Sequence, residues 1–175
     1  MLIDQKGIPG KDAARMMLGD RFGADGDDFV RIRREYETDN LKNIEVFEGF
    51  TETASELENK GFKIGICTSA NPEFFSKMLE IAPQLNKFSR HVVMKGDYVR
   101  GKPDAEPLLT TFRKMEITNS EAIYVGDAFA DFEAAKNAES KFVYFCNGER
   151  DNRIPSGICR IEKHSQLLNL LNLNL

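Results

Sequence analysis

The 175-residue sequence is poor in the residues that build disulfide scaffolds and zinc centres. Its three cysteines, Cys67, Cys146 and Cys159, are an odd number and have none of the spacings that bind metals. Its two histidines, His91 and His164, have no neighbours of the ligand or catalytic-triad type. We therefore expect free thiols, buried at Cys67 and Cys146, and histidines that are ordinary surface or loop residues.

Excess positive charge and long apolar runs are also missing. Lysine and arginine total 24 against 28 acidic residues, which gives a net charge of −4 and an isoelectric point near 5.3. This balance provides no basic surface for nucleic acid. No apolar run approaches the roughly 20 residues that a membrane-spanning helix needs. The opening MLIDQKGIPG lacks the zones of a signal peptide, so we expect a cytoplasmic protein that binds neither nucleic acid nor membrane.

What the sequence does contain is an alternation of strand-like and helix-like segments from residue 46 onward. Between the strand-like segments, apolar residues recur at the spacing of a helix face, and the leucine-rich end predicts a closing helix. This alternation is typical of an α/β fold, with a parallel sheet covered by helices on both faces. Residues 11–43 have a charged helical pattern of their own. The predicted strands are FKIGIC (62–67), HVVM (91–94), AIYVG (122–126), KFVYF (141–145) and ICRI (158–161).

Polar clusters lie where the strands of such a sheet meet the following helices, which is where open α/β sheets bind ligands. Thr68 and Ser69 follow the first strand, and hydroxyl and backbone N–H groups at a helix start suit a phosphate, with simple helix capping as the alternative. Lys102, in Gly101–Asp104, is a point charge suited to an anion, or a solvated loop lysine.

The third cluster is an acid pair in the stretch AIYVGDAFADFEAAKNA, residues 122–138. Asp127 leaves a predicted strand and Asp131 lies four residues later, so one helical turn brings both carboxylates to the same side. Two close carboxylates repel each other unless a cation lies between them, and Mg²⁺ binds carboxylates together with phosphate oxygens. The alternative is that Asp127 caps the helix and Asp131 is an acid favoured in its first turn.

The order and spacing of three segments resemble the haloacid dehalogenase superfamily, in particular its phosphoglycolate phosphatase and β-phosphoglucomutase-like branch. The segments are VFEGFTETASELENKGFKIGICTSA, RGKPDAEPLL and YVGDAFADFEAAKNA, and the resemblance covers Val46 to about Gly148. It implies a Rossmann-like three-layer core in residues 46–175 and a partial helical cap in residues 1–45.

The same resemblance implies a Mg²⁺-dependent phosphatase that hydrolyses a small phosphomonoester. Thr68, helped by Ser69, would hydrogen-bond the transferring phosphoryl group, and Lys102 would stabilise its negative charge. Asp127 would bind Mg²⁺, with Asp131 as a second ligand or as its support. The partner would be a small phosphorylated metabolite, and the protein would be a monomer or a homodimer.

One motif of that superfamily is missing: a first strand that ends in Asp-x-Asp-Gly-Thr and provides the attacking aspartate. The nearest candidate, Asp4, has Lys6 where the second acid should stand. We therefore expect the first core strand to be absent between the Thr68 and Asp127 strands, and a shortened form of the enzyme is the interpretation we favour. A catalytically inactive binding or regulatory module is the alternative. A nucleotide-binding loop at Gly10-Lys11 is excluded, because Gln5 and Asp12 stand where the motif needs glycine and serine or threonine.

Overall fold

The structure, a computed structural model, describes residues 28, 31–32, 41–43, 45–146, 148 and 150–174. Most of the predicted cap in residues 1–45, including Asp4, lies outside the described residues. The division into cap and core therefore stays a prediction.

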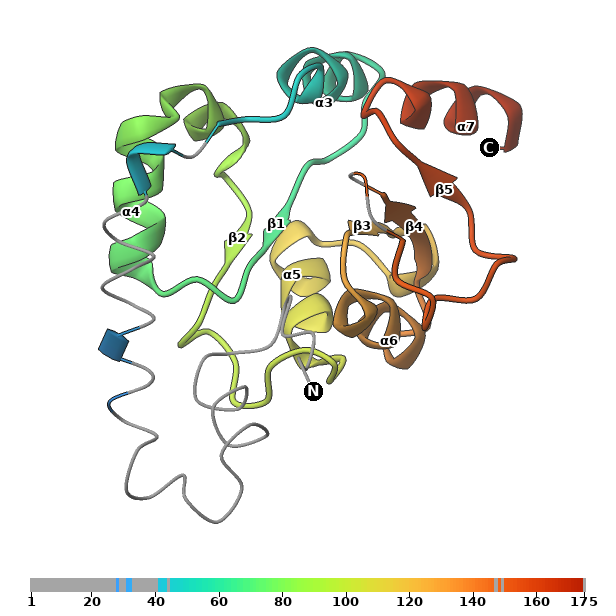
Figure 1. The fold of residues 1–175 in the computed structure, drawn as a ribbon. Coiled ribbons are helices and arrows are strands. Elements are labelled where there is room, and N and C mark those ends of the chain that lie inside the picture. Colours follow the sequence, from blue (N-terminus) through green and yellow to red (C-terminus); the bar gives the residue numbers. More distant parts are fainter. Residues whose placement is uncertain are drawn as a thin grey trace.

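The described part is an α/β fold, as predicted, and all five predicted strands are present, β4 over its whole predicted length and the other four in shorter form (Figure 1). The strands are β1 (Ile66–Cys67), β2 (Val92–Val93), β3 (Ile123–Gly126), β4 (Lys141–Phe145) and β5 (Arg160–Ile161). The helices are α3 (Phe50–Asn59), α4 (Pro72–Ile81), α5 (Glu106–Met115), α6 (Phe129–Asn137) and α7 (Gln166–Asn174), with 3-10 turns at Leu41–Asn43, Pro83–Phe88 and Asn119–Glu121. Within the described residues, no helix is both long and apolar enough to span a membrane.

Local sequence signals explain where several helices begin and end. The side chain of Asn71 accepts a 2.8 Å hydrogen bond from the N–H of Phe74, and Pro72 fills the first position of α4. Gly61 takes a left-handed conformation, with φ at 89°, just after α3. Asn71 and Pro72 thus set the start of α4 just beyond the carboxyl end of β1, and Gly61 ends α3 before that strand begins.

All strand pairs are parallel, but they form two sheets rather than one. β1 pairs with β2, with Ile66 opposite Val92, and β4 lies between β3 and β5, with Val125 opposite Val143. In the part of the chain that the structure describes, no strand joins β1 to β3. All four residues of β3 are only half-buried, whereas Val143 to Phe145 in β4 are buried.

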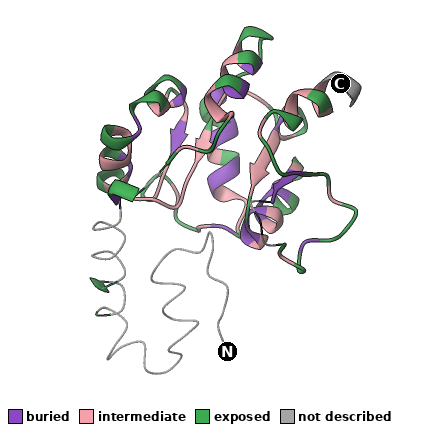
Figure 2. Cartoon of the chain, turned by 45° about the horizontal axis from the view of Figure 1, so that its top comes forward, coloured by how far each residue is buried: buried purple, intermediate pink, exposed green. Residues whose placement is uncertain are grey.

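The hydrophobic core continues across this interruption. Leu108 of α5 is fully buried, as are the adjacent alanines 134 and 135 of α6, and Cys67 of β1 and Tyr124 of β3 pack against this one cluster. On the other face of the β3–β5 sheet, Val143, Phe145 and Ile161 pack against leucines of α7. The result is three layers, with α5 and α6 on one side and α3 and α7 on the other (Figure 1). Figure 2 shows that strands and helices both contribute buried residues.

The predicted thiols and histidines have mixed outcomes. All three cysteines are free, and Cys146 is buried as expected, but Cys67 is only half-buried. His164 lies in the turn between β5 and α7, which agrees with the predicted loop position, but it is half-buried and its ring packs between aromatic side chains. The ring stacks on Phe145 at 4.4 Å between centroids and meets Phe50 edge-on at 5.3 Å.

Burial lowers the pKa of His164, and a hydrogen bond with the Glu48 backbone opposes only part of that effect. The Nδ1 atom is buried and has no hydrogen-bond partner in the described structure. The neutral imidazole therefore suits this junction between α3, β4 and α7.

We expect acid to destabilise the protein through His164. Because the folded-state pKa lies below the unfolded value of about 6.5, protonation favours the unfolded chain, and this contribution to stability is lost as the pH falls from about 7 through the folded-state pKa. His164→Phe keeps an aromatic ring in place and removes the titrating group, so its midpoint of thermal unfolding should fall less between pH 7.5 and pH 5. His91→Gln is the matched control, and an identical fall in all three proteins would contradict the assignment.

Candidate active site

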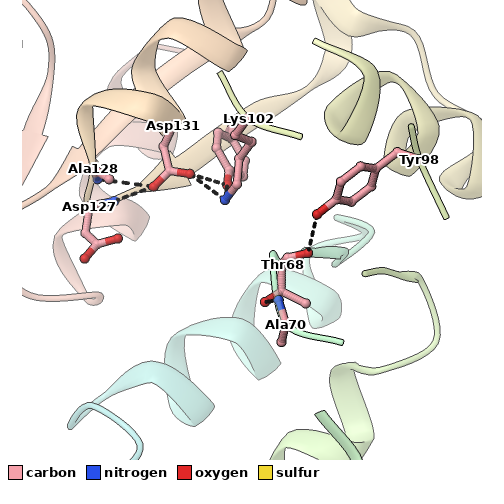
Figure 3. A network of polar contacts seen from close by, with 8 residues as sticks. Thr68, Ala70, Tyr98, Lys102, Asp127, Ala128 and Asp131 are labelled. Carbon is pink, nitrogen blue, oxygen red and sulfur yellow. Dashed lines mark hydrogen bonds and ion pairs between the residues drawn. The ribbon is translucent and has the colours of Figure 1, made fainter. Parts of the chain in front are cut away.

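The polar residues predicted from the sequence lie at the carboxyl ends of β1 and β3 and in the loop before α5. Thr68 follows β1, Lys102 lies between β2 and α5, and Asp127 follows β3. Asp131 lies in the first turn of α6. Figure 3 shows two groups of contacts, one around Lys102 and Asp131 and the other around Thr68.

Lys102 and Asp131 form a buried ion pair. The Lys102 Nζ donates to Asp131 Oδ1 at 2.6 Å and to the Tyr124 hydroxyl at 3.0 Å, and the Tyr124 hydroxyl donates to the same Oδ1 at 2.9 Å. The two charged side chains are only 7% and 5% exposed. The other carboxylate oxygen of Asp131 accepts from the backbone N–H groups of Asp127 at 3.3 Å and Ala128 at 3.2 Å (Figure 3). Both oxygens of Asp131 are therefore engaged.

The surroundings of this pair fix its charges. Burial by itself lowers the pKa of Lys102. The charge and hydrogen bond of Asp131, together with smaller effects of Cys67 and Tyr98, outweigh burial, so the pKa lies above its ordinary value. Burial, reinforced by the negative charge of Asp131, raises the pKa of Tyr124 well above its ordinary value. At neutral pH the group therefore contains an ammonium and a neutral phenol.

The backbone at the end of β3 lets the Asp131 side chain approach it closely, because residue 126 is a glycine. A Cβ atom at Gly126 would lie 2.5 Å from the Asp131 Cβ and 2.8 Å from its Oδ2. Only glycine leaves room there for the Asp131 side chain to fold back against the strand end. The glycine before Asp127 is thus required by the ion pair.

The two acids of the predicted pair do not point at the same place. The carboxylate of Asp131 turns to Lys102, whereas that of Asp127 points away from the ion pair (Figure 3). Among the described residues, no three His, Cys, Asp or Glu side chains are grouped as a metal site. Mg²⁺ ligation by Asp127 and Asp131 stays a prediction, and the geometry favours the supporting position for Asp131.

Thr68 belongs to the second group of contacts. Its Oγ1 accepts from the N–H of Ala70 at 3.1 Å, and its carbonyl oxygen accepts from the Tyr98 hydroxyl at 3.4 Å (Figure 3). The cap of α4 comes from Asn71 rather than from Thr68. Capping of α4, the alternative to phosphate binding considered for Thr68, therefore does not explain the presence of its hydroxyl.

The two groups are neighbours, although no hydrogen bond in the described structure joins Thr68 to Lys102. Burial raises the pKa of Cys67, which precedes Thr68, and the positive charge of Lys102 offsets part of that rise. The same is true of Tyr98, whose pKa burial raises and Lys102 partly lowers. The Lys102 ammonium is thus near enough to act electrostatically on the Thr68 turn.

Two tyrosines of this site, Tyr98 and Tyr124, were not predicted from the sequence. Tyr124 had a readable signal, because a tyrosine inside an apolar strand needs a hydrogen-bond partner for its hydroxyl. Tyr98 had none, since its contact with Thr68 joins residues 30 positions apart.

The ion pair gives a direct stability test. Asp131→Asn leaves the buried Lys102 without a counter-charge, and we expect the free energy of unfolding to fall by about 3–5 kcal/mol at pH 7. Asp127→Asn changes the neighbouring acid in the same way but leaves the ion pair intact, so it should cost less than about 1 kcal/mol. Urea denaturation measures both, and equal losses in the two variants would contradict the assignment.

The family model for haloacid dehalogenase-like hydrolases matches residues 4–145. The chain is 30% identical over 141 residues to a phosphoglycolate phosphatase of Nitrosospira multiformis, covering 77% of this chain and 61% of that protein. It is 29% identical over 116 residues to the pyrophosphatase PpaX of Bacillus cereus, covering 66% of this chain and 53% of that protein. The chain thus spans less than two thirds of the length of either relative.

A solved structure supports the fold. A hydrolase from Pseudomonas syringae matches with a TM-score of 0.77 at 22% identity, over 96% of this chain and 79% of that chain. The likeness confirms the Rossmann-like arrangement that the sequence predicted.

Proposed function

The chain belongs to the haloacid dehalogenase-like hydrolase family, and we propose that it forms the core of a Mg²⁺-dependent phosphatase acting on a small phosphomonoester. The observation that carries this proposal is the fixed position of Lys102. An ammonium has three N–H donors, and Asp131 and Tyr124 engage two of them. The third is left for an anionic oxygen, at the edge of the sheet where such folds bind ligands.

Preorganised charge is what phosphoryl transfer requires from a protein, because negative charge on the phosphoryl oxygens must be neutralised in the transition state. The Lys102 ammonium is held in position, because it is buried and forms an ion pair with Asp131. In this proposal Asp131 and Tyr124 are positioning residues that act through Lys102.

Thr68 and Ser69 hold the phosphoryl oxygens in the proposed site. Because the Thr68 Oγ1 already accepts from Ala70, its own proton remains for a phosphate oxygen. The N-terminus of α4 lies directly after this turn, and its backbone N–H groups favour an anion.

The carboxylate of Asp127 is the proposed Mg²⁺ ligand. It stands at the carboxyl end of β3 and points away from the ion pair, and carboxylate oxygen is the ligand type that Mg²⁺ prefers. When bound, the cation supplies positive charge that opposes the charge of the phosphoryl group. Asp131 has both oxygens engaged by protein donors, so we assign it to support rather than to ligation.

The attacking aspartate is proposed to come from an additional strand between β1 and β3. That strand would pair with the two edges that face the interruption of the sheet, and its end would lie beside Thr68 and Lys102. The remaining predictions, a cytoplasmic monomer or homodimer with a small phosphorylated metabolite as partner, form part of this proposal.

The alternative function is a binding or regulatory module that keeps the anion site without turnover. It is favoured by the lack of an Asp-x-Asp-Gly-Thr motif in this sequence. Calorimetry with phosphate and Mg²⁺ on the 175-residue chain separates the two functions when it is combined with an activity screen. Binding without hydrolysis, even after the strand is restored, would support the module.

The catalytic proposal predicts turnover once the strand is present. A version that carries an added N-terminal strand ending in Asp-x-Asp-Gly-Thr should hydrolyse a phosphomonoester in a broad screen with Mg²⁺. Thr68→Val in that version keeps the side-chain shape but removes the donor, and kcat should fall by roughly 100-fold.

The metal assignment has its own control in the same version. Asp127→Asn should weaken Mg²⁺ binding by about 10- to 100-fold, measured by calorimetry, and should reduce turnover at limiting Mg²⁺. Glu133→Gln, a change at a half-buried acid of α6 that pairs with Lys136, should leave both unchanged. Failure of the restored version to hydrolyse any ester in the screen would exclude the enzymatic function.

A further inference from the structure

A cleft of about 600 Å³ lies outside the candidate active site, beside β4 and β5. The loop that connects these strands forms its wall, and Figure 1 shows this loop in orange and red on the side of the sheet away from β1. We call it the arginine cleft, because two arginines, Arg150 and Arg160, line it. The other lining residues used below are Tyr144, Asn152, Ile154 and Ser156.

The wall of the arginine cleft is held by specific contacts. The N–H of Asp151 donates to the Tyr144 hydroxyl at 3.0 Å, and Ile154 is buried against Tyr144 and Cys146. The Nε of Arg153 donates a hydrogen bond to the Asp151 carboxylate at 2.8 Å. The loop is therefore anchored to β4 at both a polar and an apolar point.

Only some of the charged side chains at the cleft have a partner of opposite charge. Asp151, the acid of the cleft, is already paired with Arg153. The side chains of Arg150 and Arg160 have no ion pair or hydrogen bond with any residue that the structure describes, and both are exposed. The cleft thus presents two guanidinium groups whose positive charge no described acid neutralises.

The chemistry of the lining selects a class of ligand. Guanidinium groups bind phosphate through paired N–H donors, and the Asn152 amide and the Ser156 hydroxyl add further polar groups. The Tyr144 ring and Ile154 provide apolar surface for an organic part. We propose that the arginine cleft is a second anion site, which binds the phosphate group of a small phosphorylated molecule.

This site is separate from the proposed catalytic one. The catalytic residues lie at the ends of β1 and β3, whereas the arginine cleft lies over β4 and β5, the far strands of the three-stranded sheet. The proposal needs no turnover and no metal, so it does not depend on the proposed phosphatase function.

Phosphate binding to the 175-residue chain, followed by amide chemical shifts, tests the proposal. Thr68→Val serves as the background, because it removes the proposed catalytic donor. In this background, inorganic phosphate and glycerol phosphate should shift the signals of residues 150–160. Arg150→Gln with Arg160→Gln should then weaken the binding by at least tenfold.

The control double variant is Arg90→Gln with Arg113→Gln, which removes the same charge from exposed arginines outside the cleft. It should leave the affinity within twofold, and circular dichroism checks that each variant is folded. Equal weakening in the two double variants would show a diffuse charge effect and overturn the proposal. Absence of shifts at residues 150–160, or succinate binding there as tightly as glycerol phosphate, would overturn it as well.

Because the two sites are read from different signals, their failures are distinguishable. In the unsubstituted chain, absence of phosphate-induced shifts near Thr68 together with shifts at residues 150–160 would count against the phosphatase proposal alone. The reverse pattern would count against the arginine cleft alone.

Discussion

The buried ion pair between Lys102 and Asp131 is the interaction on which the arrangement of the site depends. Burying two opposite charges is favourable only when each has its hydrogen bonds satisfied, and removal of either partner leaves a costly unpaired charge. This requirement fixes the neighbours of the pair. Tyr124 must present its hydroxyl from β3, Gly126 must lack a side chain, and α6 must start where its first N–H groups reach Asp131. One interaction therefore ties the loop before α5 to the end of β3 and the start of α6.

The interruption between β1 and β3 is the second feature that shapes the function. A central strand of an α/β sheet normally pairs with a neighbouring strand along each of its two edges. In contrast, β1 and β3 each have one edge without a described partner. The apolar cluster formed by α5 and α6 nevertheless continues beneath both strands, through Cys67 and Tyr124. One helical layer thus covers both sheets. A strand added between β1 and β3 would pair with the backbone groups at their free edges. In the proposed function the same strand would carry the nucleophile.

Positive charge is used in two different ways in this acidic protein. Lys102 is held rigidly by an acid and a phenol, which leaves a single directed donor. Arg150 and Arg160 are exposed and lack described acid partners, so their charge is available to a ligand from solution. The first arrangement suits stabilisation of a reacting group, which needs a fixed geometry. The second suits binding, in which a flexible side chain can close on its ligand.

The sequence by itself determined the fold class, the order of the strands along the chain and the family. Alternating periodicities mark strands and helices through local rules, and the motifs around Thr68, Lys102 and Asp127 are contiguous enough to be read. Only the tertiary structure decided what Asp131 does. From its spacing, Asp131 was equally suited to a metal or to a supporting position, and the choice depends on Lys102, which is 29 residues away in the chain. The same applies to Tyr98 and His164, whose partners come from distant segments, since burial and hydrogen bonding between such segments are set by packing and not by any local pattern.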